Sequence, residues 1–89
     1  MKYRRKADVV ARSVAGENLL VPVHGCTRSV YTLNVTACRL WDAIEALRTE
    51  DELVELLIRR YHIPDETART DVRLFLEDLT RMELAEKLD

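Results

Sequence analysis

The sequence has little glycine, proline or cysteine, with two of each among its 89 residues. This scarcity, together with a hydrophobic share of 47%, excludes a disordered, collagen-like or disulfide-stapled chain. No apolar run approaches the roughly 18–20 residues of a membrane span. The basic start, Met1 to Lys6, lacks the apolar core of a signal peptide. We therefore expect a cytoplasmic protein with a single domain over residues 1–89 and an ordered core over about residues 8–84.

The two cysteines do not form a metal-binding pattern. Cys26 and Cys38 lie twelve positions apart and neither belongs to a CxxC pair. His24 and Cys26 offer two ligands, whereas a structural zinc site needs four. We expect two reduced thiols, no bound metal and no cofactor.

Charge is unevenly distributed along the chain. Residues 1–49 carry eight Lys and Arg against four Asp and Glu, whereas residues 50–89 carry six against twelve. A nucleic-acid-binding domain usually places basic residues on its recognition element. Because the later, helical part is acidic, this charge pattern disfavours nucleic acid as a partner.

Three short extended segments precede residue 34: Asp8–Val14, Asn18–Val23 and Arg28–Leu33. They are rich in β-branched and other apolar residues. Turn sequences around Gly16 and Gly25 separate them. Short connections between consecutive strands favour antiparallel neighbours, so we predict a three-stranded meander.

The periodicity becomes helical after Asn34. Asn34 or Thr36 is suited to cap the first helix, since a short oxygen-bearing side chain accepts from free backbone N–H groups. Its apolar stripe is Ala37, Leu40, Trp41, Ile44 and Leu47. A capping box of Thr49 and Glu52 opens the second helix. The apolar face of that helix is Leu53, Val54, Leu57, Ile58 and Tyr61.

Pro64 ends the second helix and Asp65 is expected to cap the third, which runs to about Met82. The core stripe of this third helix is Val72, Phe75, Leu76, Leu79 and Met82. Leu74 lies off that stripe, and residues 83–89 are expected to fray. The resulting fold class is α+β, a three-stranded antiparallel sheet followed by three helices that pack on one of its faces.

Catalytic motifs are absent from the sequence, and the carboxylates are explained as helix caps and solvated faces. We therefore expect no enzymatic activity. The strand Arg28–Leu33 ends the meander, so one edge of it is free to pair with an extended peptide or to remain solvated. Val30 and Thr32 point to one face of this strand, and Tyr31 and Leu33 point to the other.

Several stretches of the chain resemble the PqqD family, which is named for a protein of pyrroloquinoline quinone biosynthesis. They are Asp8–Arg12, Glu17–Pro22, Tyr31–Ala37, Leu40–Trp41 and the later Leu53, Leu57, Tyr61, Asp71–Val72, Phe75–Leu76 and Leu79. The most specific part is Leu33-Asn34 followed by Ala37 and Trp41.

The resemblance implies a winged-helix-like precursor-peptide recognition element without catalytic residues. Such domains bind the leader of a ribosomally made (RiPP) precursor peptide and present it to a modifying enzyme, often a radical S-adenosylmethionine enzyme. The leader lies as an added strand beside the third strand, in a groove whose other wall is the third helix. Carried over, the peptide-binding residues are Arg28, Val30, Tyr31, Thr32 and Leu33 on the strand, with Asp71, Leu74, Phe75 and Asp78 on the helix.

Other interpretations of these residues remain open. Phe75 is suited to core packing, and Tyr31 can point into the core. Asp71 and Asp78 suit either a solvated helix face or pairing with a basic leader residue. As whole functions, a winged-helix nucleic-acid-binding protein and a structural docking subunit of a larger enzyme are the alternatives. Self-association through the third strand is a further option.

Overall fold

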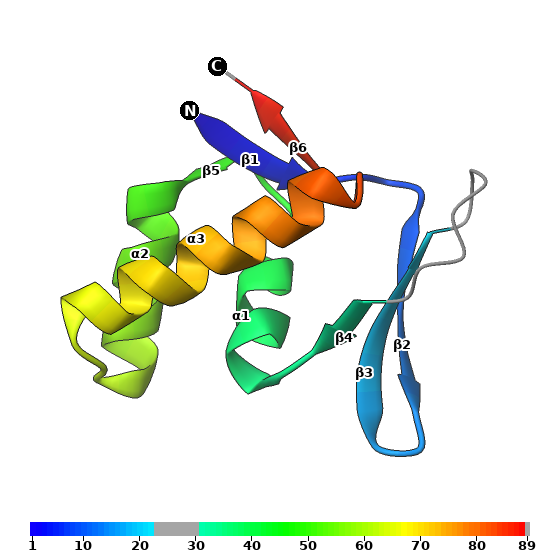
Figure 1. Ribbon diagram of the computed structural model, residues 1–89, viewed down its shortest axis with the longest axis horizontal. Helices are drawn as coiled ribbons and strands as arrows, with labels where there is room; N and C mark the ends of the chain where they lie inside the picture. The colour runs from blue at the N-terminus through cyan, green and yellow to red at the C-terminus, as the bar shows by residue number, and fades with distance from the viewer. Residues whose placement is uncertain (23–30, 89) are drawn as a thin grey trace.

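The computed structural model describes residues 1–22 and 31–88, and Figure 1 shows how its elements are arranged. The elements are, in chain order, β1 (Lys2–Arg5), β2 (Val9–Val14), β3 (Glu17–Pro22), β4 (Tyr31–Leu33), α1 (Val35–Ala43), β5 (Arg48–Thr49), α2 (Glu50–Tyr61), α3 (Asp65–Arg81) and β6 (Ala85–Leu88). The predicted α+β class is confirmed, with the antiparallel sheet β2-β3-β4 and three helices.

The strands β2 and β3 form a hairpin, as the sequence predicts. They pair from Val9↔Pro22 to Val14↔Glu17 around the turn Ala15-Gly16. Both turn residues have positive φ, 51° and 84°, which suits the right-handed twist of a hairpin. The hairpin projects away from the helices in Figure 1, and β2 is exposed from Val10 to Val14. Its tip therefore contributes little to the core.

A second sheet, ordered β5-β1-β6, joins the two ends of the chain (Figure 1). Lys2 pairs with Leu88 and Arg5 with Ala85, so the prediction that residues 83–89 fray is wrong for β6. These strands are short and their partners are far apart in the sequence, so they show no local hydrophobic periodicity from which they could be predicted. Burial of Leu84 and Ala85, 1% and 4% exposed, anchors β6 to the core.

The first strand is fixed to α1 through Arg5. Its backbone N–H donates to the carbonyl oxygen of Ile44 at 2.9 Å. Its guanidinium carbon lies 5.3 Å from the centre of the Trp41 ring, in a cation–π arrangement. The basic start of the chain is therefore part of the fold.

Asn34 caps α1: its side-chain oxygen accepts from the backbone N–H of Ala37 at 2.8 Å. Of the two predicted caps, Asn34 is the correct one. Ala37, Leu40 and Trp41 are buried as expected. Leu47 was predicted to extend this stripe, but it is 40% exposed. The helix ends at Ala43, so residue 47 no longer follows the helical phase.

The capping box at the start of α2 is confirmed in both directions. The N–H of Glu52 donates to Thr49 Oγ1 at 3.1 Å, and the N–H of Thr49 donates to Glu52 Oε1 at 2.9 Å. Asp65, by contrast, does not cap α3. Pro64 occupies the cap position with no side-chain bond, and Asp65 is the first helical residue, paired with Arg69 at 2.8 Å.

The core lies between the three helices and one face of the sheet β2-β3-β4. Its largest fully buried members, each about 2% exposed or less, are Leu20, Leu40, Ile44, Leu53, Val54, Leu57, Val72, Leu79 and Leu84. The helix α3 contributes five buried residues, more than either of the other helices, and the predicted core residues Phe75 and Leu76 are among them. This packing fixes the side of α3 that remains free.

Candidate functional site

The strand β4 has an open edge. It pairs antiparallel with β3 through Asn18↔Leu33, Leu19↔Thr32 and Leu20↔Tyr31, and no other described strand pairs with it. Along an antiparallel edge, alternate residues direct their N–H and C=O groups outward. These groups can hydrogen-bond an extended chain. β2 also has an outer edge that pairs with no described strand. Which of the two edges suits a peptide therefore depends on the side chains that lie beside each edge.

A groove of about 180 Å³ lies between β4, the start of α1 and one face of α3. Its lining residues are Tyr31, Asn34, Thr36, Ala37, Leu40, Asp71, Leu74, Phe75 and Asp78. The α3 members follow the i, i+3, i+4, i+7 spacing of one helix face. We call this hollow the β4–α3 groove. By contrast, β2 is exposed on both faces from Val10 onward, so the described residues form no comparable apolar wall along it.

Two larger hollows lie elsewhere on the described surface. One, of about 630 Å³, lies between α1 and α2 and is lined by four arginines, Arg39, Arg48, Arg59 and Arg60, among other residues. The other, of about 880 Å³, lies beside β1 and the start of β2. Neither includes a residue of β4. Both are lined largely by charged side chains, some of which pair with one another, as Arg48 does with Glu52 and Arg4 with Glu86.

Leu74 gives the groove an exposed apolar surface. Its side chain is 55% exposed, whereas the adjacent Phe75 is only 5% exposed and belongs to the core. The off-stripe position predicted for Leu74 is therefore correct. The Phe75 ring meets the Tyr31 ring edge to face, with centroids 6.5 Å apart and planes at 74°. Phe75 thus supports the groove from beneath while Leu74 faces the solvent.

Tyr31 and Asp78 face each other across the groove. Burial raises the pKa of the Tyr31 phenol, the charge of Asp78 raises it further, and Arg81 acts in the opposite direction. Asp78 also accepts from Arg81 at 2.7 Å. The phenol is therefore neutral at physiological pH, and its O–H can donate a hydrogen bond in the groove.

The predicted site residues fall into four groups. Tyr31, Asp71, Leu74, Phe75 and Asp78 all line the groove. Leu33 is 6% exposed and is a core residue, while Thr32 is exposed and lies on the opposite face of β4. The arrangement of Tyr31 toward the core with Thr32 outward is the one observed. Arg28 and Val30 lie outside the described residues.

Sequence reasoning missed the α1 side of the groove. Asn34, Thr36, Ala37 and Leu40 line it, although Asn34 was identified only as a cap and Ala37 and Leu40 only as core. The Thr36 hydroxyl donates to Asn34 Oδ1 at 3.0 Å, so the cap itself forms one end of the groove. The sequence pattern of one helix cannot show that its N-cap residue also borders a groove, because this depends on where α3 crosses α1.

The described part of the chain holds no cluster of three or more His, Cys, Asp or Glu side chains that could bind a metal ion. Its one described cysteine, Cys38, is a half-buried free thiol. Among the described helices, none is long and apolar enough to cross a membrane.

The fold is a small α+β domain that combines an open strand edge with a helix-lined groove. The profile of the family described as coenzyme PQQ synthesis protein D (PqqD) matches residues 19–85, so the chain belongs to the PqqD family. Comparison with curated protein sequences finds no significant match.

Solved structures share this fold. TbiB1 in complex with the TbiA(beta) leader peptide is similar at a TM-score of 0.77 and 24% identity, over 97% of this chain and 98% of that one. Lasso peptide synthetase B1 complexed with the leader peptide is similar at 0.77 and 14%, over 98% and 100%. The PqqD truncation of Methylobacterium extorquens PqqCD, described as a stand-alone RiPP recognition element, is similar at 0.74 and 15%, over 97% and 89%.

Proposed function

We propose that this protein is a non-catalytic adaptor that binds the leader of a ribosomally synthesised precursor peptide and presents it to a modifying enzyme. The observation that carries the proposal is the open edge of β4 beside the exposed Leu74 of α3. Membership of the PqqD family supports it. So does the shared fold with proteins described in complex with leader peptides.

The leader would bind by strand addition. Its backbone pairs with the outward N–H and C=O groups along β4, including those at Thr32 or Leu33, and this pairing supplies affinity that depends little on sequence. Every second leader side chain then points toward α3. An apolar side chain on that side covers Leu74, and Tyr31 and Asp78 border it. Arg28 and Val30, also predicted from the resemblance to bind the peptide, lie outside the described residues, and their contribution stays a prediction.

The chemistry of the modification belongs to the partner in this proposal, and we propose a radical S-adenosylmethionine enzyme as that partner. Tyr31 of the groove is not suited to act as a base. The pKa of Tyr31 is raised, which is opposite to the shift that would let a phenol act as a base near neutral pH. A cytoplasmic location suits an adaptor that meets a newly made peptide.

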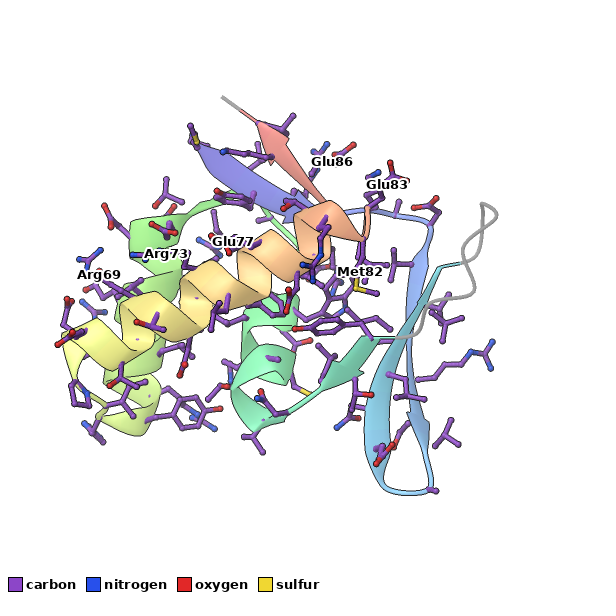
Figure 2. All side chains as sticks on the ribbon, in the orientation of Figure 1. Arg69, Arg73, Glu77, Met82, Glu83 and Glu86 are labelled. Atoms are coloured by element: carbon purple, nitrogen blue, oxygen red, sulfur yellow. The ribbon has the colours of Figure 1, made fainter. Side chains whose placement is uncertain are left out.

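Pairing of two of the three arginines on α3 favours the adaptor over a nucleic-acid-binding role. Arg69 is paired with Asp65 and Asp51 at 2.8 and 3.1 Å, and Arg81 with Asp78 at 2.7 Å. Arg73 and Glu77 are exposed and do not line the β4–α3 groove, and Figure 2 labels both on α3. A recognition helix for phosphates would present unpaired basic residues along one face.

An NMR titration of the ¹⁵N-labelled protein with precursor peptides encoded beside its gene tests the proposal. We expect amide shifts concentrated on β4 and on residues 71–78 of α3. Shifts on β2 instead would indicate that the peptide binds at the edge of β2, on the other side of the sheet. Shifts with duplex DNA but with no peptide would contradict the adaptor role.

A further inference from the structure

We infer that the β4–α3 groove selects a peptide segment in which an apolar side chain and a lysine or arginine lie two residues apart. This inference rests on the proposed function and specifies the class of peptide that the groove takes. Strand addition uses backbone hydrogen bonds, which depend little on the side chains of the peptide. Any selectivity for peptide sequence must therefore come from the side chains that line the groove. The size, charge and spacing of its lining residues lead to this motif.

The size of the groove suits one side chain rather than a whole small molecule. Its volume of about 180 Å³ is below the roughly 300 Å³ at which small-molecule sites begin. Its apolar surface is centred on Leu74, which is the only lining residue of α3 that is both apolar and exposed. One apolar leader residue therefore fills it.

Among the described residues, the charged groups that line the groove are all acidic. α3 contributes Asp71 and Asp78, β4 contributes the neutral phenol of Tyr31, and α1 contributes only uncharged residues. No lysine or arginine is among the described lining residues. Arg81, three residues beyond Asp78 on α3, is bound to Asp78 at 2.7 Å. The groove therefore presents a negative potential to a peptide, and an acidic peptide would be repelled.

The two carboxylates are not equivalent. Asp78 is half-buried and already paired with Arg81. Asp71 is exposed, and it forms no ion pair with any described residue. Asp71 is therefore the carboxylate that is free to bind a cationic side chain of the peptide.

The two-residue spacing of the motif follows from the backbone geometry of α3 and of the added strand. Leu74 lies three residues after Asp71, a rise of about 4.5 Å along α3. Alternate side chains on one face of a strand are about 6.6 Å apart. A long, flexible lysine or arginine covers the difference, so an apolar residue over Leu74 places the residue two positions away beside Asp71. Residues one position away point to the other face of the added strand.

Two synthetic peptides test the inference directly. The first is acetyl-Gly-Thr-Lys-Thr-Leu-Thr-Lys-Thr-Gly-amide, and the second carries glutamate in place of both lysines. We expect the lysine peptide to bind about five- to tenfold more tightly at 50 mM sodium chloride, and the ratio to shrink at 0.5 M. Asp71→Asn should reduce the ratio several-fold, and Asp71→Lys should reverse the preference. Glu77→Gln is the matched control, since it removes the same charge from the same helix away from the groove.

Each outcome bears on a defined part of the account. Equal affinities of the two peptides, with amide shifts still confined to the groove, would overturn the charge preference and leave the adaptor role standing. A lysine peptide that fails to bind, or an equal effect of Glu77→Gln and Asp71→Asn, would also overturn it. If no precursor peptide shifts the groove residues, the proposed function itself fails.

Discussion

The Tyr31 ring meets the Phe75 ring edge to face, with centroids 6.5 Å apart, and this contact joins the open strand β4 to α3. Phe75 is 5% exposed, so the same side chain closes the core and supports the groove. The position of the open β4 edge relative to α3 therefore depends on core packing. This dependence leads to the first prediction.

Phe75→Ala is expected to lower the free energy of unfolding by about 3–4 kcal/mol, because it removes a buried aromatic ring and leaves a cavity. Phe75→Leu retains most of the volume and should cost less than about 1.5 kcal/mol. Urea unfolding followed by circular dichroism measures both. If Phe75→Ala unfolds at the wild-type urea midpoint, the ring is not part of the core.

The alkaline stability of the protein should report on Tyr31. Burial and the charge of Asp78 raise the pKa of Tyr31 in the folded state, whereas the unfolded tyrosine titrates near its ordinary value of 10.0. Above that pH the folded state binds more protons than the unfolded state, so the free energy of unfolding falls as pH rises. The contribution is fully present below pH 10 and is lost as pH passes the raised pKa.

Tyr31→Phe removes this titration and should flatten the alkaline part of the stability curve. The measurement is the urea midpoint at a series of pH values up to about 11, in both proteins. An unchanged slope in Tyr31→Phe would contradict the assigned environment of the phenol.

The capping box predicts a separate acid dependence. Hydrogen bonds from the backbone and side chain of Thr49 lower the pKa of Glu52, and Arg48 and Lys2 contribute to the same shift. The stabilisation is present above the ordinary glutamate value of 4.5 and is lost as pH falls through the lowered pKa. Glu52→Gln should show less of this acid loss in thermal melts. Thr49→Ala should cost about 1 kcal/mol at neutral pH.

Pairing of the chain ends predicts a cost for truncation. Removing residues 85–89 deletes β6, exposes the outer edge of β1 and uncovers the core around Leu84. We expect a fall in Tm of at least about 10 °C, given that Leu84→Ala alone should cost about 2–4 kcal/mol. A full-length variant, Lys87→Ala, controls for loss of an exposed side chain on the same strand. Equal melting of the truncated and complete proteins would show that β6 does not stabilise the fold.

Local patterns predicted most of the fold. The helical period identified all three helices, and short polar signals identified the Asn34 cap and the Thr49–Glu52 capping box. β1, β5 and β6 were missed because their pairing is between residues up to 86 positions apart, as for Lys2 and Leu88. Such short strands carry no periodicity of their own. Leu47 was misplaced because the end of α1 is set by the connection to β5.

The candidate site was predicted in part for similar reasons. The position of Leu74 beside the core stripe, on the side shared with Asp71 and Asp78, is visible in the helical pattern. Their assignment to a peptide site came from the resemblance to the PqqD family and stays a prediction. The burial of Leu33 follows from strand alternation once one face is known. The contribution of Thr36 and Leu40 depends on the crossing of α3 over α1, which no single-element pattern contains.

The most direct test of the central claim is the affinity of two leucine variants for a precursor peptide encoded beside the gene. Leu74→Asp places a charge in the groove. Leu47→Asp makes the same change at a leucine that is 40% exposed and does not line the groove. Isothermal titration calorimetry should show binding at least about tenfold weaker for Leu74→Asp and unchanged for Leu47→Asp, with circular dichroism spectra alike. Equal affinity of the folded Leu74→Asp variant and the wild type would contradict the β4–α3 groove as the peptide-binding site.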